Sequence, residues 1–376
     1  MIFNRADVLI PSPSVDPEKW SVIACDQHSA EPEYWDALER YVGNVPSTLH
    51  MMLPEAYLSK DILQEAESIH RVMRDYLENG VFTEVHDSYV YVERTLPSGV
   101  IRRGLVGMVD LDQYDYRRDS VSPIRATEGT VEERLPARVK IRSGAPLEMP
   151  HIMVFMNDPE NHVFNHVEPG RLLYDFELNC GGGHLVGWQV TGIAADRVDH
   201  AFQQLVSEAD DRYRDMAPVV LAIGDGNHSL ATAKKCGYRY ALAEIVNIND
   251  ASIVFEPIHR VLFGTDTEEF VHQFGSSIAR VKQDEGENYA SLIARMDRFC
   301  SDYLNRYGGT VDYIHNDDAA IEMGSRDNCA AILLPALDKS TLFDSIAEYG
   351  PFPKKSFSIG HAAEKRYYME CRKLGS

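Results

Sequence analysis

No stretch of the 376-residue sequence approaches the roughly 18 to 20 consecutive apolar residues of a membrane-spanning helix. The first 16 residues (MIFNRADVLIPSPSVD) also lack the continuous hydrophobic segment of a secretory signal. Neither a membrane span nor a signal peptide is therefore expected. Low-complexity tracts and repeats of fixed period are missing as well, which disfavours solenoids and propellers.

Cysteine and basic residues are few. The six cysteines are scattered and form no Cys-x-x-Cys pair, which argues against a zinc ribbon or a disulfide framework and favours reduced thiols in a cytoplasm. Lys and Arg number 37 against 58 Asp and Glu, so the formal net charge is −21. Such a surface repels nucleic-acid phosphates, so nucleic-acid binding is disfavoured, and an anionic substrate needs a local basic pocket.

What is present is the composition of a globular protein, with 44% apolar and 25% charged residues. Helix-like and strand-like segments alternate irregularly, which predicts an α+β or irregular α/β fold with a mixed sheet and flanking helices. We expect a main α+β domain over residues 1–262, with the ligand site, and a C-terminal α+β domain over residues 263–376 packed against it. The sequence leaves open whether the chain forms a homo-oligomer.

Apolar periodicity places the main elements along the chain. Helical spacing predicts helices over residues 32–41, 59–79, 195–213, 229–236, 270–281 and 289–307. Alternating or β-branched runs predict strands over residues 81–109, 138–142, 151–156, 219–223 and 240–247. The strand over residues 138–142 would put three cations on one face and two aliphatic side chains on the other.

The strongest local signal is the apolar strand 219–223, which stops at Gly-Asp-Gly (224–226) and is followed by Asn-His-Ser (227–229) and a helix. The glycines let backbone amides approach a ligand, and a helix N-terminus presents unpaired N–H groups to an anion. Asp225 could hold Mg²⁺ or accept a hydroxyl proton, and His228 could donate to a phosphate oxygen or shuttle a proton. A plain β-turn with an Asn or Ser N-cap is the alternative, and spacing alone does not separate the two.

Residues 125–142 form a second candidate, because they concentrate cations in a protein that has few. Glu128 and Thr130 in this segment could serve as an acid/base group and a hydrogen-bond donor. A solvated charged face is the alternative interpretation.

Three further candidates lie at strand ends or near the C-terminus. Asp26 to His28 and the pair His259-Arg260 follow short strands, where polar residues of an α/β sheet often face a ligand crevice. Lys355 and Ser356 could contact a phosphate. Satisfied loop residues and a solvated basic segment are the alternatives.

Taken in order, these segments resemble one family, a widespread prokaryotic group catalogued as domain-of-unknown-function family 1015. That family carries an Arg-His-Glu-x-Thr element followed by Arg-Leu, and later an Ala-Asp-Gly-His-His-Arg-Tyr-x-Thr-Ala element. An His-Arg follows a short strand, and a Pro-x-Lys-Ser-Thr-x-Phe element lies near the C-terminus. The corresponding stretches here are residues 125–135, 224–233, 257–261 and 353–357, in the same order across nearly the whole chain.

The sequence departs from the family pattern at each of its main elements. Asn227 and Ser229 stand where the family has the first His and the Arg of Asp-Gly-His-His-Arg. The first element lacks its His, which is replaced by Ala126, and contains one more residue. Phe357 follows Ser356 directly, so the last Thr has no match. The chain is therefore identified as a divergent member. Loss of a single transition-state contact can lower a rate about 100- to 1000-fold.

The Asp-Gly-x-His element also resembles the ParB/sulfiredoxin-like fold, in which the loop and helix start bind nucleotide phosphates and some members phosphorylate free serine. This resemblance implies a core of that type around the Asp225 loop. It also implies a small-molecule kinase that uses ATP or ADP with Mg²⁺ and acts on a hydroxyl metabolite such as a serine-like amino acid. Asp225 would bind Mg²⁺, Glu128 would act as general base, and His228 would steady the transferring charge.

The remaining residues of this hypothesis contact the anionic ligand or the substrate. The phosphate or nucleotide contacts would be Gly226, Asn227, Ser229, Arg125, Thr130, Arg134, Arg260, Lys355 and Ser356, and the substrate contacts Asp26, His28 and His259. A non-catalytic nucleotide or small-anion sensor and a phosphatase-type hydrolase are the alternatives. A ParB-like role on DNA is disfavoured by the net charge.

Overall fold

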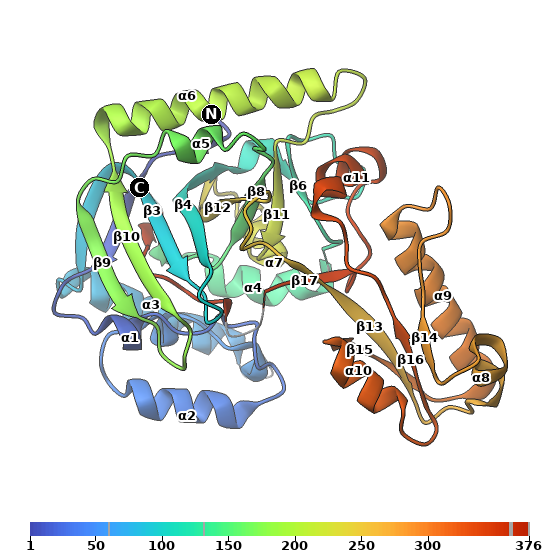
Figure 1. Ribbon diagram of the computed structural model, residues 1–376. Helices are drawn as coiled ribbons and strands as arrows, with labels where there is room; N and C mark the ends of the chain where they lie inside the picture. Colours follow the sequence, from blue (N-terminus) through green and yellow to red (C-terminus); the bar gives the residue numbers. More distant parts are fainter. Residues whose placement is uncertain (59–60, 131, 361–363, 375–376) are drawn as a thin grey trace. The chain divides into compact units, whose positions relative to one another are not determined.

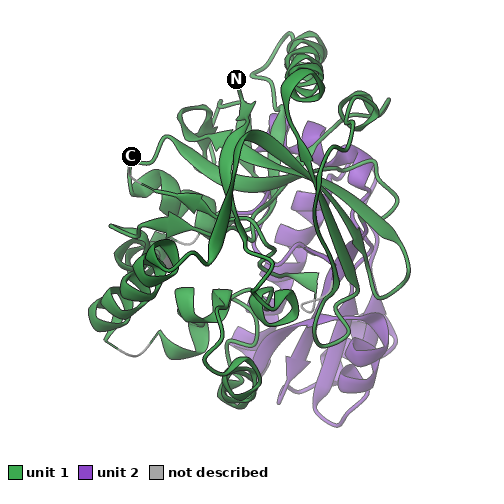
Figure 2. Cartoon of the chain, turned by 90° about the vertical axis from the view of Figure 1, so that its left-hand side faces the viewer, with its two compact units in different colours: residues 1–126, 130–253, 361–376 green, residues 127–129, 254–360 purple. Residues whose placement is uncertain are grey.

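The computed structural model describes residues 1–58, 61–130, 132–360 and 364–374. Two compact units make up the chain: unit 1 comprises residues 1–126, 130–253 and 361–376, and unit 2 comprises residues 127–129 and 254–360 (Figure 2). The sequence predicts a single division after residue 262 instead. The difference arises because strand β13 (Phe255–Phe263) pairs with strands of unit 2, and because the chain returns to unit 1, where Cys371 pairs with Leu9.

Unit 1 is built on an eleven-stranded mixed sheet with the main path β5-β6-β11-β8-β12-β4-β3-β10-β9. Strand β1 pairs with β4, and β2 pairs with β3. Pairs β11–β6 and β12–β8 are parallel, whereas β11–β8 and β12–β4 are antiparallel, which confirms the predicted mixed sheet. The strands are β1 (Phe3–Asn4), β2 (Ala6–Pro11), β3 (Phe82–Thr95), β4 (Ile101–Asp110), β5 (Tyr114–Asp115), β6 (Ile124–Ala126), β8 (Met153–Met156), β9 (Leu172–Glu177), β10 (His184–Val190), β11 (Leu221–Asp225) and β12 (Tyr240–Asn247).

Helices flank this sheet on both faces. Because side chains alternate along a strand, Tyr89 and Tyr91 of β3 join the core that α6 covers, whereas Val90 and Val92 join the core that α3 covers. Figure 1 shows α6 and α3 on opposite sides of β3 and β4. The helices of unit 1 are α1 (Pro17–Trp20), α2 (Pro32–Val42), α3 (Ile62–Glu78), α4 (Leu135–Arg142), α5 (His162–Asn165), α6 (Gly192–Arg212) and α7 (Asn227–Lys235).

Short elements complete unit 1. Strands β7 (Leu147–Glu148) and β18 (Arg372–Lys373) form a separate antiparallel pair, which ties the C-terminal segment to the chain before β8. The short 3₁₀ helices are η1 (Thr48–Met51), η2 (Glu55–Tyr57), η3 (Leu111–Gln113) and η4 (Glu132–Arg134).

The strand predicted over residues 138–142 is wrong, because this segment is the second half of helix α4. The alternation Arg-Val-Lys-Ile-Arg is only five residues long, and so short a pattern does not distinguish a strand from a helix. The change matters for the site. In a helix, Arg138 and Arg142 are four residues apart and therefore lie on one face.

Unit 2 contains a five-stranded sheet with the path β14-β16-β13-β15, and β17 pairs with β13. Its strands besides β13 are β14 (Ile278–Arg280), β15 (Thr310–His315), β16 (Cys329–Leu333) and β17 (Phe357–Ile359). Its helices are α8 (Glu268–Phe274), α9 (Tyr289–Tyr307), α10 (Asp317–Gly324) and α11 (Leu342–Tyr349), with the 3₁₀ helix η5 (Lys339–Thr341). The helix predicted over residues 270–281 ends early, because Gly275 with φ of 74° closes α8 and strand β14 follows.

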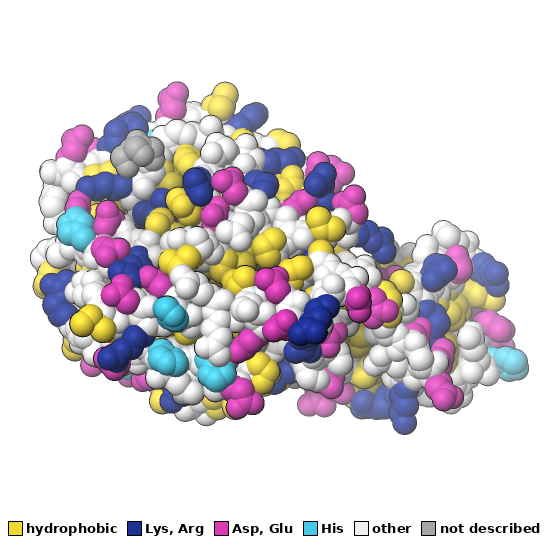
Figure 3. Space-filling model, turned by 90° about the horizontal axis from the view of Figure 1, so that it is seen from above, with side chains coloured by type: hydrophobic (Ala, Val, Ile, Leu, Met, Phe, Trp, Pro, Cys, Tyr) yellow, Lys and Arg dark blue, Asp and Glu magenta, His cyan; other side chains and the backbone are white. Residues whose placement is uncertain are grey.

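Charged side chains of both signs lie on the surface. Over the face in Figure 3, Lys and Arg side chains are interspersed with Asp and Glu side chains. Each of the six cysteines lies in the described part of the chain as a free thiol. Within the described ranges, every helix falls short of the length and apolar character needed to cross a bilayer.

Candidate functional site

The turn between β11 and α7 brings polar groups to the end of a buried strand. β11 lies between β6 and β8 in the sheet, and Ala222 and Ile223 are fully buried. Gly226 follows with φ of 81° and is the N-cap of α7. A Cβ atom at this position would lie 3.0 Å from Cγ1 and 3.1 Å from Cα of Ile152. The site therefore requires glycine for its backbone conformation and for its close packing.

Gly226 has no side chain with which to cap the helix that it begins. The amides in the first turn of an α-helix have no carbonyl acceptor within the helix and carry the positive end of its dipole. The α7 N-terminus therefore has the physical character of an anion site, which is the property predicted from the sequence.

The Asp225 carboxylate bonds to the turn and lies near a lysine. Its Oδ1 accepts the N–H of Gly226 at 2.9 Å, and its Oδ2 lies 3.4 Å from Nζ of Lys365. Lys365 comes from the C-terminal segment of unit 1. The turn thus has a cation beside it that is 140 residues away in sequence, and no local pattern identified it.

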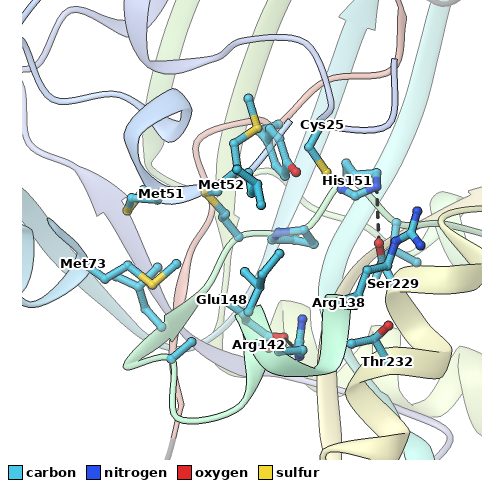
Figure 4. A pocket seen from close by; sticks show the side chains of 18 of the residues that line it. Cys25, Met51, Met52, Met73, Arg138, Arg142, Glu148, His151, Ser229 and Thr232 are labelled. Atoms are coloured by element: carbon cyan, nitrogen blue, oxygen red, sulfur yellow. Dashed lines mark hydrogen bonds and ion pairs between the residues drawn. The ribbon is translucent and has the colours of Figure 1, made fainter. Parts of the chain in front are cut away.

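A cavity of about 140 Å³ lies within unit 1 beside α7, and Ser229 and Thr232 of that helix line it (Figure 4). Nε2 of His151 lies 3.4 Å from Oγ of Ser229. Other lining residues come from the segments around residues 25, 51–58, 138–152 and 367. The first two turns of α7 therefore contribute to the wall of a cavity in which a ligand can be held.

Helix α4 contributes Arg138 and Arg142 to the cavity wall, one turn apart. Arg138 pairs with Glu55, and Arg142 pairs with Glu148. Glu148 also accepts from Nε of Arg372 at 2.7 Å and from the backbone N–H of Leu242 at 3.0 Å. The group contains three arginines, Arg138, Arg142 and Arg372, and two glutamates, Glu55 and Glu148. One positive charge therefore remains after pairing.

Asp26 is partly buried next to this cavity. Burial raises the pKa of its carboxyl group, but the charges of His151 and Lys365 and a hydrogen bond from Gln27 outweigh burial, so the pKa lies below its ordinary value. Nε2 of Gln27 donates to Oδ1 of Asp26 at 2.9 Å. Asp26 is therefore an anion at neutral pH, with Lys365 as a nearby cation.

Cys25 and Tyr367 line the cavity as neutral groups. Burial, together with the charge of Asp26, raises the pKa of the Cys25 thiol to about 11. Burial and the neighbouring Cys25 raise the pKa of the Tyr367 phenol well above its usual value. At neutral pH both side chains keep their protons, so Cys25 is not an activated nucleophile.

The residues predicted from sequence divide between the two units. Asp26, His28, Arg125, Thr130, Arg134 and residues 225–229 belong to unit 1, and Glu128, His259, Arg260, Lys355 and Ser356 belong to unit 2. The Arg134 side chain lies outside the part of the chain that the structure describes. Within unit 1, Asp26 and the turn at Asp225 share their cation, Lys365.

Arg125 is buried and bonded to the backbone of its own neighbourhood. Its Nε donates to the Ser122 carbonyl at 2.8 Å, and its Nη2 donates to the Ala217 carbonyl at 2.9 Å. It therefore ties the loop before β11 to β6. The ring of His28 stacks on the ring of Tyr34, with centroids 3.9 Å apart.

Two predicted contacts carry buried oxygens without partners. Thr130 Oγ1 and Asn227 Oδ1 are buried and accept or donate no hydrogen bond among the described residues. Asn227 is the first residue of α7. Its unpaired oxygen lies at the same helix N-terminus as the candidate anion site.

The predicted histidine and arginine of unit 2 are held by hydrogen bonds to other residues of that unit. His259 is fully buried; its Nδ1 accepts the N–H of Leu334 at 3.1 Å, and its Nε2 lies 3.1 Å from Oδ1 of Asp317. Nε of Arg260 donates to Oδ1 of Asp297 at 2.8 Å. Its Nη1 donates to the carbonyl of Lys355 at 2.9 Å.

Ser356 is also bonded locally, since its hydroxyl donates to the Pro353 carbonyl at 2.6 Å. Glu128 forms an isolated parallel bridge with Phe352. Among the motif residues of unit 2, the buried Arg260 thus joins β13 to the segment before β17 through its bond to the Lys355 carbonyl.

Sequence reasoning missed His151, Lys365 and the apolar lining of the cavity. His151 is the first residue of the strand predicted over residues 151–156, and Lys365 lies in a short polar segment, so neither carries a local signal. The two arginines of α4 were noticed as cations, but on a strand.

Comparisons with known proteins give one family match. The family described as a protein of unknown function, DUF1015, matches residues 9–371. None of the curated proteins matches the chain.

Several solved structures are similar at low identity. Free serine kinase in complex with AMP is 11% identical, with 70% of this chain and 90% of that chain covered and a TM-score of 0.34. A variant of free serine kinase in complex with ADP is 12% identical, with 70% and 91% covered and a TM-score of 0.36. A conserved hypothetical protein from Pyrococcus furiosus is 10% identical, with 71% and 94% covered and a TM-score of 0.32.

Proposed function

The chain belongs to the DUF1015 family of proteins of unknown function, and for this member we propose a nucleotide-dependent phosphoryl transfer to the hydroxyl of a small metabolite. The observation that carries the proposal is the N-terminus of α7. It begins at a glycine without a capping side chain, and its first two turns line a cavity of unit 1. Helix N-termini of this kind bind phosphate through their backbone amides.

The charges around the turn favour an anionic ligand. Lys365 lies 3.4 Å from Asp225, and Arg138 and Arg142 stand in the cavity wall. In a protein with a net charge of −21, Lys365 beside the turn and the arginines in the cavity wall supply local positive charge for a nucleotide. Ser229 adds a hydroxyl donor at this end of the cavity.

The proposed reaction forms one bond and breaks one bond. The acceptor oxygen bonds to the terminal phosphorus of ATP, the bond from that phosphorus to the bridging oxygen breaks, and ADP leaves. The hydroxyl proton passes to a carboxylate, and the assignment of this base to Glu128 stays a prediction from the sequence. Asp26, ionised at neutral pH because of its low pKa, would accept a hydrogen bond from the acceptor and orient it.

Magnesium would reach the site with the nucleotide. Among the described residues, no group of three or more His, Cys, Asp and Glu side chains is arranged to hold a metal ion. Mg²⁺ in nucleotide sites needs only one or two carboxylates, because phosphates and water supply the other ligands. Asp225 fits that role as a single ligand, and the ion would neutralise charge on the phosphates.

A nucleotide or small-anion sensor is the second candidate. Asn227 and Ser229 replace a His and an Arg of the family pattern. The turn has therefore lost two donors that could stabilise a transition state, but it keeps the backbone amides that can bind a phosphate. A phosphatase-type hydrolase would use the same turn with water as the acceptor. The ParB/sulfiredoxin-like character of the Asp225 loop stays a prediction.

Binding and turnover test the proposal in sequence. ATP or ADP with Mg²⁺ at about 100 times its dissociation constant should stabilise the full chain by about 2.7 kcal/mol, which raises its melting temperature. Incubation with ATP and a panel of hydroxyl metabolites should then release ADP only when an acceptor is present. Release without an acceptor would identify a hydrolase, and binding without release would identify a sensor. No stabilisation by any nucleotide would refute the proposal.

A matched pair of variants assigns the activity to the turn. Asp225→Asn removes the carboxylate that pairs with Lys365 and should abolish ADP release. Asp266→Asn is the control, because Asp266 also accepts a backbone N–H in its own turn, at 2.9 Å, but in unit 2. Equal turnover in both variants would exclude Asp225 from the reaction.

A further inference from the structure

The cavity beside α7 has two chemically different ends. Figure 4 shows Met51, Met52 and Met73 on one side, away from His151 and Ser229 on the other. Met51 ends η1, Met52 follows it, and Met73 lies on α3. The apolar lining is completed by Leu53, Leu58, Ile141, Ala145, Leu147 and Met149. We call the region around Met51, Met52 and Met73 the methionine end.

Most polar atoms of the charged groups next to the methionine end bond to one another, although Nε of Arg142 is buried without a partner among the described residues. Glu148 accepts from Arg142 and Arg372 and from the backbone N–H of Leu242. Both of its oxygens are therefore occupied. A ligand at this end meets mainly van der Waals contacts and finds few free donors or acceptors.

Methionine side chains are unbranched and polarizable, so they adapt to apolar groups of different shape. The whole cavity, with its polar end, has a volume of about 140 Å³, which is close to that of an apolar cavity of about 150 Å³ that holds benzene. The methionine end is only part of this volume and can thus accept an apolar group of about three or four carbon atoms.

We propose that the methionine end binds an apolar chain of the phosphoryl acceptor, whose hydroxyl lies toward His151 and Ser229. The inference rests on the proposed function for the reaction, but the site itself is defined by the cavity. The substrate class is then an amphiphilic hydroxy metabolite, and a serine-like amino acid would leave the methionine end unfilled. Adenine is a poorer occupant, because a base is recognised through hydrogen bonds that this end does not supply.

A series of straight-chain alkyl phosphates, from methyl to octyl, tests the inference by calorimetric titration of the full chain. The phosphate reports on the polar end, and the chain reports on the methionine end. Each methylene that enters the cavity should tighten binding about fourfold. The dissociation constant should therefore fall up to about three or four carbons and then level off.

Two variants and one control assign the effect to the methionine end. Met73→Ala lengthens the cavity and should move the levelling-off point to longer chains, whereas Met52→Phe fills it and should move that point to shorter chains. Met156→Ala is the control, since Met156 is fully buried in the core that α6 covers and does not line the cavity. It should keep the wild-type dependence on chain length despite a comparable loss of stability.

Three results would overturn the inference: a dissociation constant that does not change with chain length, displacement of hexyl phosphate by adenosine, or the same shift in Met156→Ala as in Met73→Ala. Failure of the proposed function has a different signature. If the chain-length dependence is present but ATP and ADP do not bind, binding at the methionine end is supported and the proposed phosphoryl transfer is refuted. If the nucleotides bind and the alkyl phosphates show no dependence, only the inference falls.

Discussion

Gly226 and Gly237 bracket α7 and provide a matched pair of substitutions. Their φ angles are 81° and 79°, a conformation that costs an L-residue about 1–2 kcal/mol. Gly226→Ala and Gly237→Ala should therefore both lower the free energy of unfolding by that amount. A Cβ atom at Gly237 meets nothing within 4 Å, whereas one at Gly226 lies 3.0 Å from Ile152.

The contact with Ile152 adds a second cost to Gly226→Ala only. Overpacking of this kind costs about 1–3 kcal/mol when the neighbours must shift. Ile152 lines the cavity next to His151, so its displacement also disturbs the anion site. We expect Gly226→Ala to weaken ADP binding at least tenfold and Gly237→Ala to leave it within about twofold of the wild type.

Urea unfolding of each variant gives the stability, and calorimetric titration with ADP gives the affinity. The two readouts separate a general loss of stability from a local effect on the site. If Gly226→Ala matched Gly237→Ala in both, the close approach of Gly226 to Ile152 would have no role in binding, and the reasoning would be refuted.

Three further predictions concern charge. The lowered pKa of Asp26 gives stability that is present above its unfolded pKa of about 3.9 and is lost as the pH falls through the lower folded value. Urea unfolding should therefore find Asp26→Asn less stable than the wild type at pH 7, and the difference should shrink as the pH falls below about 3.9. Burial raises the pKa of Glu370 from 4.5 to about 7, so its contribution is complete below pH 4.5 and is lost as the pH rises to 7. Glu370→Gln should remove that decline, and an unchanged pH profile would contradict the assignment. Asp297→Ala should destabilise unit 2 by about 3–5 kcal/mol, because it leaves the fully buried Arg260 unpaired; a loss below about 1 kcal/mol would contradict this.

Local patterns predicted the strand and helix around the site well. Helix α3 follows the predicted apolar stripe, with Ala66, Ile69 and Met73 buried. Helix α7 was predicted from residue 229 but begins at Asn227, because Gly226, and not a polar side chain, is its N-cap. The turn's conformation depends on the packing of Gly226 against Ile152, which a single sequence does not reveal.

The rest of the site depends on contacts between distant segments. Lys365 reaches Asp225 from the C-terminal segment, and the methionine end combines residues of η1 and α3 with residues of the β7–β8 region. Arg138 and Arg142 share a face only because their segment is helical, and that helix packs against α7 and α3. Tertiary packing overrode the short alternating pattern there.

Titration with ADP of a Ser229→Asp variant tests the central claim most directly. Ser229 is the third residue of α7, where an acidic side chain stabilises a helix but repels a bound phosphate. Ser291→Asp is the control, because Ser291 is the third residue of α9 in unit 2. The account predicts at least tenfold weaker ADP binding in Ser229→Asp, no loss of its stability, and wild-type binding in Ser291→Asp. Unchanged ADP affinity in Ser229→Asp would contradict it.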